Sequence, residues 1–104
     1  MTNKNAVLIA KKYIDLIKTK GITVKYAYLF GSYAKGKPTI HSDIDICIIS
    51  PTFTGYRQTN RVRLMNLRHT ISDDIEPHPL TPEEFNNQYD PFVREVKKGI
   101  SLDQ

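Results

Sequence analysis

Apolar residues recur along residues 3–20 at the spacing of a helix that buries one face. Six of them lie three or four positions apart, whereas the lysines fall mostly on the other side. Gly21 follows, and glycine is common just beyond the end of a helix. The pattern therefore predicts an amphipathic first helix, with these inward residues: Ala6, Ile9, Ala10, Tyr13, Leu16 and Ile17.

Two apolar runs predict the first two strands of a sheet. Residues 22–30 alternate in character and become apolar on both faces toward their end, which is typical of a strand inside a sheet. Residues 43–50 form the second run. Because side chains alternate between the two faces of a strand, Ile44, Ile46 and Ile48 are expected to share one face and to point into a core.

Residues 56–71 predict a second long helix. Its inward side is expected to carry Val62, Met65 and Ile71, with Leu64 as a further candidate. Arg57 lies away from that side. Three further arginines are interpreted as a solvated face, with a surface for a partner or RNA as the alternative: Arg61, Arg63 and Arg68.

A third strand is predicted over residues 74–80. Pro77 and Pro79 stand two apart, so both missing amides fall on the same edge of the strand, and the strand is expected at the edge of the sheet. Two short helices should follow. Thr81 and Asp90 each precede a proline, which is the usual order of a helix cap and a first helical residue.

Helices that alternate with about three strands predict the α/β (α+β) class, a small mixed sheet packed by helices. The 104 residues are expected to form a single domain, 1–104. No apolar run approaches the ~18 residues of a membrane span, and the first residues lack the apolar block of a signal peptide, so a cytoplasmic location is expected. The net charge of +4 suits nucleotides or nucleic acid, although a mildly basic surface explains it as well.

Two carboxylates interrupt the second strand. Asp43 and Asp45 share one face, about 6–7 Å apart along the backbone, and two like charges at that spacing repel each other. A divalent cation would remove the conflict, and hard oxygen ligands of this kind suit Mg²⁺. The aspartates are therefore candidate metal ligands, with a solvated pair at a strand end as the bland alternative.

The third strand supplies a third acid. Glu76 is the preferred candidate. Asp74 is the alternative, because it lies two residues earlier and is expected on the same face of the strand. If the second and third strands are neighbours, three carboxylates meet at one end of the sheet. Three acids can hold two metal ions, one that activates an attacking hydroxyl and one bound to the leaving pyrophosphate.

A glycine-serine turn ends the first strand. Gly31 opens backbone angles that other residues avoid, and the amides of the turn with the Ser32 hydroxyl can hold a phosphate group. Lys35 and Lys37 could neutralise a triphosphate. Loop solubility explains these two lysines equally well.

Other chemistry-bearing residues have simpler explanations. His41 and His78 lie near the predicted site, but they are interpreted as polar surface residues, since magnesium prefers oxygen ligands. The single cysteine, Cys47, excludes an internal disulfide and a cysteine-cluster metal site. It is expected to be a small core residue.

The segment Gly31-Ser32, ten further residues and then Asp43-Ile-Asp45-Ile is similar to the signature of the polymerase-β-like nucleotidyltransferase superfamily. It resembles in particular the minimal nucleotidyltransferase (MNT) branch, over roughly residues 25–85. The resemblance implies the polymerase-β-like fold, with Asp43, Asp45 and Glu76 as metal ligands and Gly31 and Ser32 at the nucleotide phosphates. One difference is that the third acid is commonly Asp, whereas this chain has Glu.

The resemblance also implies an activity and a partner. It implies Mg²⁺-dependent transfer of a nucleoside monophosphate, AMP from ATP being the expected case, to an acceptor hydroxyl. Members of this branch are commonly encoded beside a helical HEPN-type protein and act as the antitoxin of the pair, and some are thought to transfer AMP to a partner tyrosine. The alternative is an antitoxin that neutralises a toxin by binding, with little or no catalysis. An RNA-binding module has only the net charge in its favour.

Overall fold

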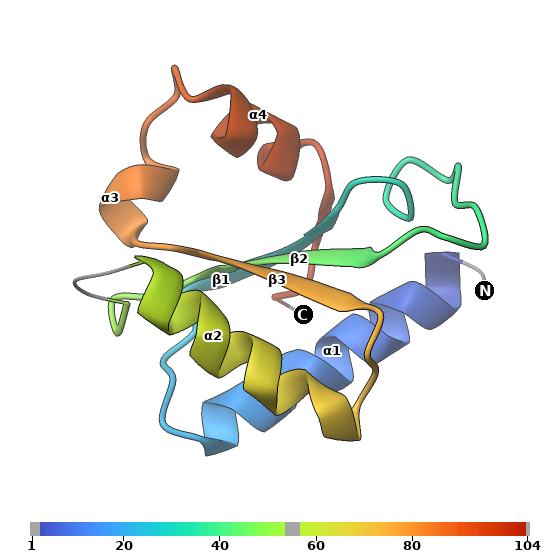
Figure 1. Ribbon diagram of the computed structural model, residues 1–104. Helices are drawn as coiled ribbons and strands as arrows, with labels where there is room; N and C mark the ends of the chain where they lie inside the picture. Colours follow the sequence, from blue (N-terminus) through green and yellow to red (C-terminus); the bar gives the residue numbers. More distant parts are fainter. Residues whose placement is uncertain (1–2, 54–56, 104) are drawn as a thin grey trace.

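Helices and strands are interspersed along the chain (Figure 1). The computed structural model describes residues 3–53 and 57–103. The elements in order are α1 (Asn3–Thr19), β1 (Tyr26–Phe30), β2 (Ile44–Ile49), α2 (Arg57–Leu67), the 3₁₀ helix η1 (Arg68–Thr70), β3 (Ile75–Leu80), α3 (Pro82–Phe85), α4 (Pro91–Lys97) and β4 (Ile100–Ser101). Within these described ranges, no helix combines the length and the apolar character that crossing a membrane requires.

The strands form one mixed sheet in the order β3-β2-β1-β4. β1 runs antiparallel to both β2 and β4, whereas β2 and β3 are parallel. The predicted mixed sheet, the internal first strand and the edge position of the third strand are confirmed. The prediction of about three strands is corrected to four, because β4 has only two residues and so carries no alternating pattern.

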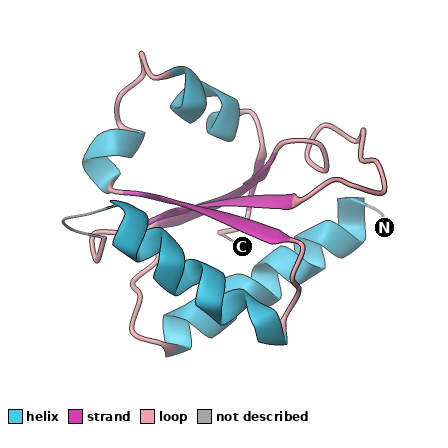
Figure 2. Ribbon diagram, in the orientation of Figure 1, coloured by secondary structure: helices cyan, strands magenta, loops and turns pink. Residues whose placement is uncertain are grey.

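Helices cover both faces of the sheet, α1 and α2 on one and α3 and α4 on the other (Figure 2). The core under α1 and α2 is the larger, and it contains the fully buried Ile44, Ile46 and Ile48, as predicted. The core under α3 and α4 is smaller and consists of Phe30, Cys47, Ile49, Leu80, Phe85, Val93 and Val96. Alternate residues of β2 therefore serve two different cores.

The packing of α1 on α2 centres on Leu64. It is fully buried, and its carbonyl accepts a hydrogen bond of 2.7 Å from the Tyr13 hydroxyl. The prediction that Val62 faces inward was wrong, since Val62 is 50% exposed. The helix predicted over 56–71 ends at residue 67 and tightens into η1, and its predicted first residue, Tyr56, lies outside the described residues.

The first strand is shorter than predicted, because residues 22–25 lie outside it. Ile22 is buried, but the only backbone hydrogen bond from this segment into the sheet within the described residues is from the Lys25 amide to the Ile49 carbonyl, at 2.8 Å. The second strand likewise begins at Ile44, one residue after the predicted start.

Both predicted helix starts in the last third of the chain are confirmed. The Thr81 hydroxyl accepts a hydrogen bond from the Glu84 amide, and the Glu84 carboxylate accepts one from the Thr81 amide, which is a complete capping box. The Asp90 carboxylate accepts a hydrogen bond of 2.8 Å from the Phe92 amide. These caps fix α3 and α4 over the smaller core.

The outer edge of β3 has few amide donors. The carbonyls of Asp74 and Leu80 accept bonds from β2, so the residues between them with odd numbers turn their main chain outward. Two of these are Pro77 and Pro79, which have no amide hydrogen. The third, Ile75, has its carbonyl bonded to Arg68 at 2.8 Å.

Candidate active site

The candidate acids lie where β1 ends and β2 and β3 begin. Phe30 is the register partner of Asp45, and Asp45 is in turn the register partner of Glu76. Partners in register point to the same face of a sheet, and neighbouring strands lie about 4.8 Å apart. The strand arrangement therefore places the Gly31 turn, Asp45 and Glu76 in one row, on the face that α3 and α4 cover (Figure 1).

Gly31 lies against the Asp45 carboxylate. Its φ of 77° falls in the left-handed region, and a Cβ atom added there would lie only 2.4 Å from Asp45 Oδ2. The turn that follows is closed by hydrogen bonds from the Lys35 amide to the Gly31 carbonyl and from the Lys37 amide to the Ser32 carbonyl, both 3.1 Å. Only a glycine lets the main chain approach this carboxylate so closely.

Asp45 is half-buried and has a basic neighbour. Its Oδ1 lies 3.2 Å from Nε2 of His78, and the imidazole packs with Phe30 and Phe92 at ring-centroid distances of 5.1 and 5.6 Å. The interpretation of His78 as a polar surface residue was wrong. The signal that could have found it is its position two residues after Glu76, which places both side chains on the same face of β3.

Glu76 is half-buried and forms an ion pair with Arg61, whose Nη2 contacts Oε1 of Glu76. Arg61 comes from α2, and the sequence analysis interpreted it as part of a solvated helix face. That interpretation was wrong, because α2 runs beside β3 and brings the guanidinium to the strand. Helical periodicity does not indicate which strand a helix will accompany, so the sequence carried no direct signal for this pair.

Two further arginines of the same segment donate hydrogen bonds to main-chain carbonyls. Arg63 donates to the Lys20 carbonyl at 2.7 Å, and Arg68 donates to the Ile75 carbonyl at 2.8 Å. Arg63 is exposed, as the predicted solvated face requires, whereas Arg68 is part-buried, and both side chains tie neighbouring segments together.

Asp43 and Asp74 lie just outside their strands and are both exposed. The Asp74 carbonyl accepts a hydrogen bond of 2.8 Å from the Ile44 amide, so its residue is at the start of the β2–β3 pairing. Glu76 remains the better third acid because it is the one in register with Asp45. A cavity of about 490 Å³ opens next to these residues, lined by Tyr33, Pro38, Thr39, Ile40 and Asp74.

The two candidate lysines follow the turn and are exposed. Lys35 forms an ion pair of 2.6 Å with Glu95 of α4. The hydrogen bond and the charge of Lys35 lower the pKa of that glutamate. Lys35 is therefore held toward α4, whereas Lys37 lies on the loop that leads to Asp43.

The carboxylates fit a magnesium site completed by substrate phosphates better than a site built from three protein carboxylates. Among residues 3–53 and 57–103, no group of three or more His, Cys, Asp or Glu side chains is arranged to hold a metal ion. The expected convergence of Asp43, Asp45 and Glu76 is therefore not reached, since Arg61 holds Glu76 and Asp43 is exposed ahead of the strand. One or two carboxylates beside the Gly31 turn still fit Mg²⁺, which commonly keeps waters and takes substrate phosphates as ligands.

Cys47 follows Asp45 on the same face but is fully buried. Burial raises the pKa of its thiol to about 12. Because the thiolate is the reactive form, Cys47 is a packing residue, as predicted, and no nucleophile.

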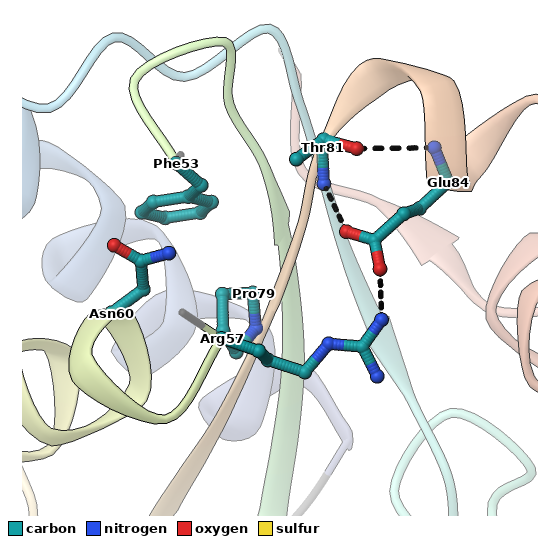
Figure 3. A pocket seen from close by; sticks show the side chains of 6 residues that line it. All are labelled: Phe53, Arg57, Asn60, Pro79, Thr81 and Glu84. Carbon is teal, nitrogen blue, oxygen red and sulfur yellow. Dashed lines mark hydrogen bonds and ion pairs between the residues drawn. The ribbon is translucent and has the colours of Figure 1, made fainter. Parts of the chain in front are cut away.

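A second ion pair between an arginine of α2 and a glutamate lies near the other end of β3. Figure 3 shows Arg57 of α2 directed to Glu84, whose carboxylate also caps α3, beside a pocket of about 170 Å³. Arg57 precedes Arg61 by one helical turn. A cavity of about 160 Å³ between the two arginines is lined by Arg57, Arg61, His78, Pro79, Leu80 and Phe92.

Comparison with known proteins shows which family the sequence matches. The family model described as "Nucleotidyltransferase domain" matches residues 10–101. A protein of Methanocaldococcus jannaschii described as a "putative protein adenylyltransferase" is 33% identical over 97 residues, which cover 91% of this chain and 87% of that protein.

Two solved structures share the fold. A nucleotidyltransferase structure from Sulfolobus solfataricus superposes with a TM-score of 0.66 at 19% identity, covering 95% of this chain and 80% of that one. A mutant of the MntA-HpeT toxin-antitoxin pair gives a TM-score of 0.60 at 21% identity, covering 88% and 69%. The fold, the row formed by the Gly31 turn, Asp45 and Glu76, and the match over residues 10–101 agree: the chain belongs to the nucleotidyltransferase domain family.

Proposed function

We propose that this protein transfers AMP from ATP to an acceptor hydroxyl in a Mg²⁺-dependent reaction. The observation that carries the proposal is the approach of Gly31 to Asp45, where no side chain larger than hydrogen fits. This approach places the amides of the turn next to the carboxylate, so a phosphate group bound by those amides can share an ion with Asp45.

Each candidate residue has a distinct role in this reaction. Asp43 and Asp45 would hold the magnesium, which supplies charge stabilisation on the phosphates. The amides of the turn and the Ser32 hydroxyl bind the triphosphate, and Lys37 is free to reach it. Lys35 can join only by leaving Glu95, an exposed pair of the kind that contributes little stability.

Glu76 is assigned to the acceptor. The acceptor oxygen attacks the α-phosphorus, the bond from that phosphorus to the bridging oxygen breaks, and pyrophosphate leaves. The proton of the hydroxyl passes to the Glu76 carboxylate, a general base in reach of a nucleophile that approaches between β2 and β3. The cavity of about 490 Å³ beside Asp74 has the volume of an ordinary small-ligand site, and it is the proposed binding site of the nucleotide.

The acceptor proposed is a tyrosine of a HEPN-type helical partner. The protein adenylyltransferase description of the 33%-identical relative supports a protein acceptor, and the likeness to the MntA-HpeT pair supports a toxin partner. Ile40, on the loop that borders the large cavity, is 94% exposed and offers an apolar contact for such a partner.

The substitution Asp45→Asn tests the activity. Transfer of α-labelled AMP to the partner should fall by at least about 100-fold, because the metal contributes several kcal/mol of transition-state stabilisation. Asp15→Asn, an exposed aspartate on α1, is the matched control and should retain full transfer. The measurement is the mass of the partner after incubation with ATP and magnesium, with circular dichroism to confirm that both variants are folded.

Neutralisation of a toxin by binding alone is the second candidate function, favoured by the likeness to the MntA-HpeT pair. The same two variants separate the candidates. If Asp45→Asn still neutralises the partner as well as Asp15→Asn does, binding carries the biological role and the transfer proposal fails.

A further inference from the structure

Each of the two in-register carboxylates has a basic partner of its own. His78 approaches Oδ1 of Asp45, and Arg61 holds Oε1 of Glu76. These partners lie on the β3 side of Asp45, whereas Gly31 lies on the β1 side. The two acids therefore have separate protein partners, an imidazole at Asp45 and a guanidinium at Glu76.

Arg61 differs from a metal ligand in that it is itself the cation. A guanidinium stays charged at any pH at which the protein is folded. The pair is half-buried, with 25% of the Glu76 side chain and 40% of the Arg61 side chain exposed, so water screens it less than a surface pair. A divalent ion that approached Glu76 would meet this permanent positive charge.

We propose that Arg61 is the resident second cation of the site: its guanidinium occupies the place at Glu76 that a second divalent ion would take, so the protein binds a single divalent ion, through Asp43 and Asp45. The inference rests on the proposed function and replaces its two-ion expectation with one ion and one arginine. Arg61 is thus a positioning residue that acts through Glu76. The contact uses Oε1, which leaves Oε2 of Glu76 to accept the hydrogen bond of the acceptor hydroxyl.

Counting bound ions tests this directly. The number of Mn²⁺ ions per complex of protein with α,β-methylene ATP can be measured by electron paramagnetic resonance of the free ion, with the protein in excess over the nucleotide. The wild-type protein should bind one ion and Arg61→Gln two, the second one at Glu76. The double variant Arg61→Gln with Glu76→Gln should return to one.

Arg57→Gln is the matched control. Arg57 lies one turn earlier on α2 and pairs with Glu84, which is no candidate ligand, so this variant should still bind one ion. Arg61→Lys, which keeps a positive charge, should also bind one, and it serves as the second variant if Arg61→Gln loses its near-ultraviolet circular dichroism.

The possible failures are distinct. Two ions on the wild-type protein, or one ion on a folded Arg61→Gln, would overturn the role of Arg61 and leave the transfer reaction standing. Two ions on Arg61→Lys would likewise overturn it. No bound Mn²⁺ on any of the proteins would overturn the proposed metal-dependent function together with this inference.

Discussion

Ile46 and Asp45 are neighbours on β2, yet their side chains lie in opposite environments. Ile46 is fully buried in the core that α1 and α2 cover, together with Ile44 and Ile48. Asp45 is half-buried on the other face, beside Phe30 at the border of the smaller core under α3 and α4. Alternation along one strand thus separates the face of the larger core from the face that carries the candidate site.

The difference teaches where this protein can tolerate change. Burial of apolar area is the dominant stabilising contribution, and the face with α1 and α2 holds more of it. The acids on the opposite face contribute charge that must be compensated, by Arg61 at Glu76 or by a bound ion. Substitutions on the first face should therefore act on stability, and substitutions on the second should act on function.

The largest effect on stability is expected from Ile46→Ala. Removing this fully buried side chain should lower the free energy of unfolding by about 2–5 kcal/mol, through lost burial and a residual cavity. Asp45→Asn, the neighbour on the other face, should change it by less than about 1 kcal/mol. Urea denaturation of both variants measures the contrast. Equal losses would show that the two faces are not separable in this way.

A smaller loss of stability is expected from Gly31→Ala, a substitution at the turn that contacts Asp45. Both Gly31 and Gly36 have positive φ, so alanine at either position should cost about 1–2 kcal/mol of stability. At Gly31 the new Cβ also meets Asp45 Oδ2, whereas at Gly36 it meets nothing within 4 Å. The carboxylate at the end of this short side chain can move aside, so the overlap should add no more than about 1 kcal/mol.

The two glycine variants should therefore differ in transfer activity more than in stability. Gly31→Ala should lower AMP transfer strongly, and Gly36→Ala should leave it near the wild-type level. Similar activities, measured by the mass of the modified partner, would argue against the close approach as the basis of the site.

The smallest effect concerns Glu84, at the border of the smaller core. Burial alone would raise the pKa of its carboxyl, but the Thr81 amide and Arg57 outweigh it, and the pKa lies below the usual 4.5. The ionised carboxylate therefore stabilises the fold above pH 4.5, and that contribution is lost as the pH falls through the lowered pKa.

Glu84→Gln should accordingly reduce stability at pH 7, and the loss should be smaller at pH 3. Glutamine can still cap α3, so the comparison isolates the charge. Urea denaturation at both pH values measures it, and Glu83→Gln, an exposed glutamate in the same turn, controls for the loss of one negative charge. A variant that is destabilised equally at both pH values would contradict this assignment.

Features set by local spacing could be predicted from the sequence. The alternation along β2 indicated that Ile44, Ile46 and Ile48 are buried together, and Pro77 with Pro79 indicated an edge strand. Each of these depends on the geometry of a single strand. β4 could not be predicted because its two residues become a strand only by pairing with β1.

The candidate site also combines features that local spacing predicts with features that depend on long-range packing. The glycine turn and the spacing of the two aspartates are local features, and the proximity of Gly31 to Asp45 agrees with them. Arg61 could not be placed, since its partner lies 15 residues away along the chain and in another element. His78 was expected near the site, but its contact with Asp45, 33 residues away, was not. Val62 was misassigned for a related reason: the face that a helix buries depends on how it packs, here around Leu64.

The prolines on the outer edge of β3 bear on how copies of this chain can associate. An edge that offers carbonyls but lacks amide hydrogens at Pro77 and Pro79 cannot complete a ladder with an incoming strand. Fibril growth and dimers that extend the sheet across β3 are thereby disfavoured, even though β3 carries the apolar residues that such growth exploits. Any assembly on that side of the molecule must be built from side chains, on the surface that α2 presents.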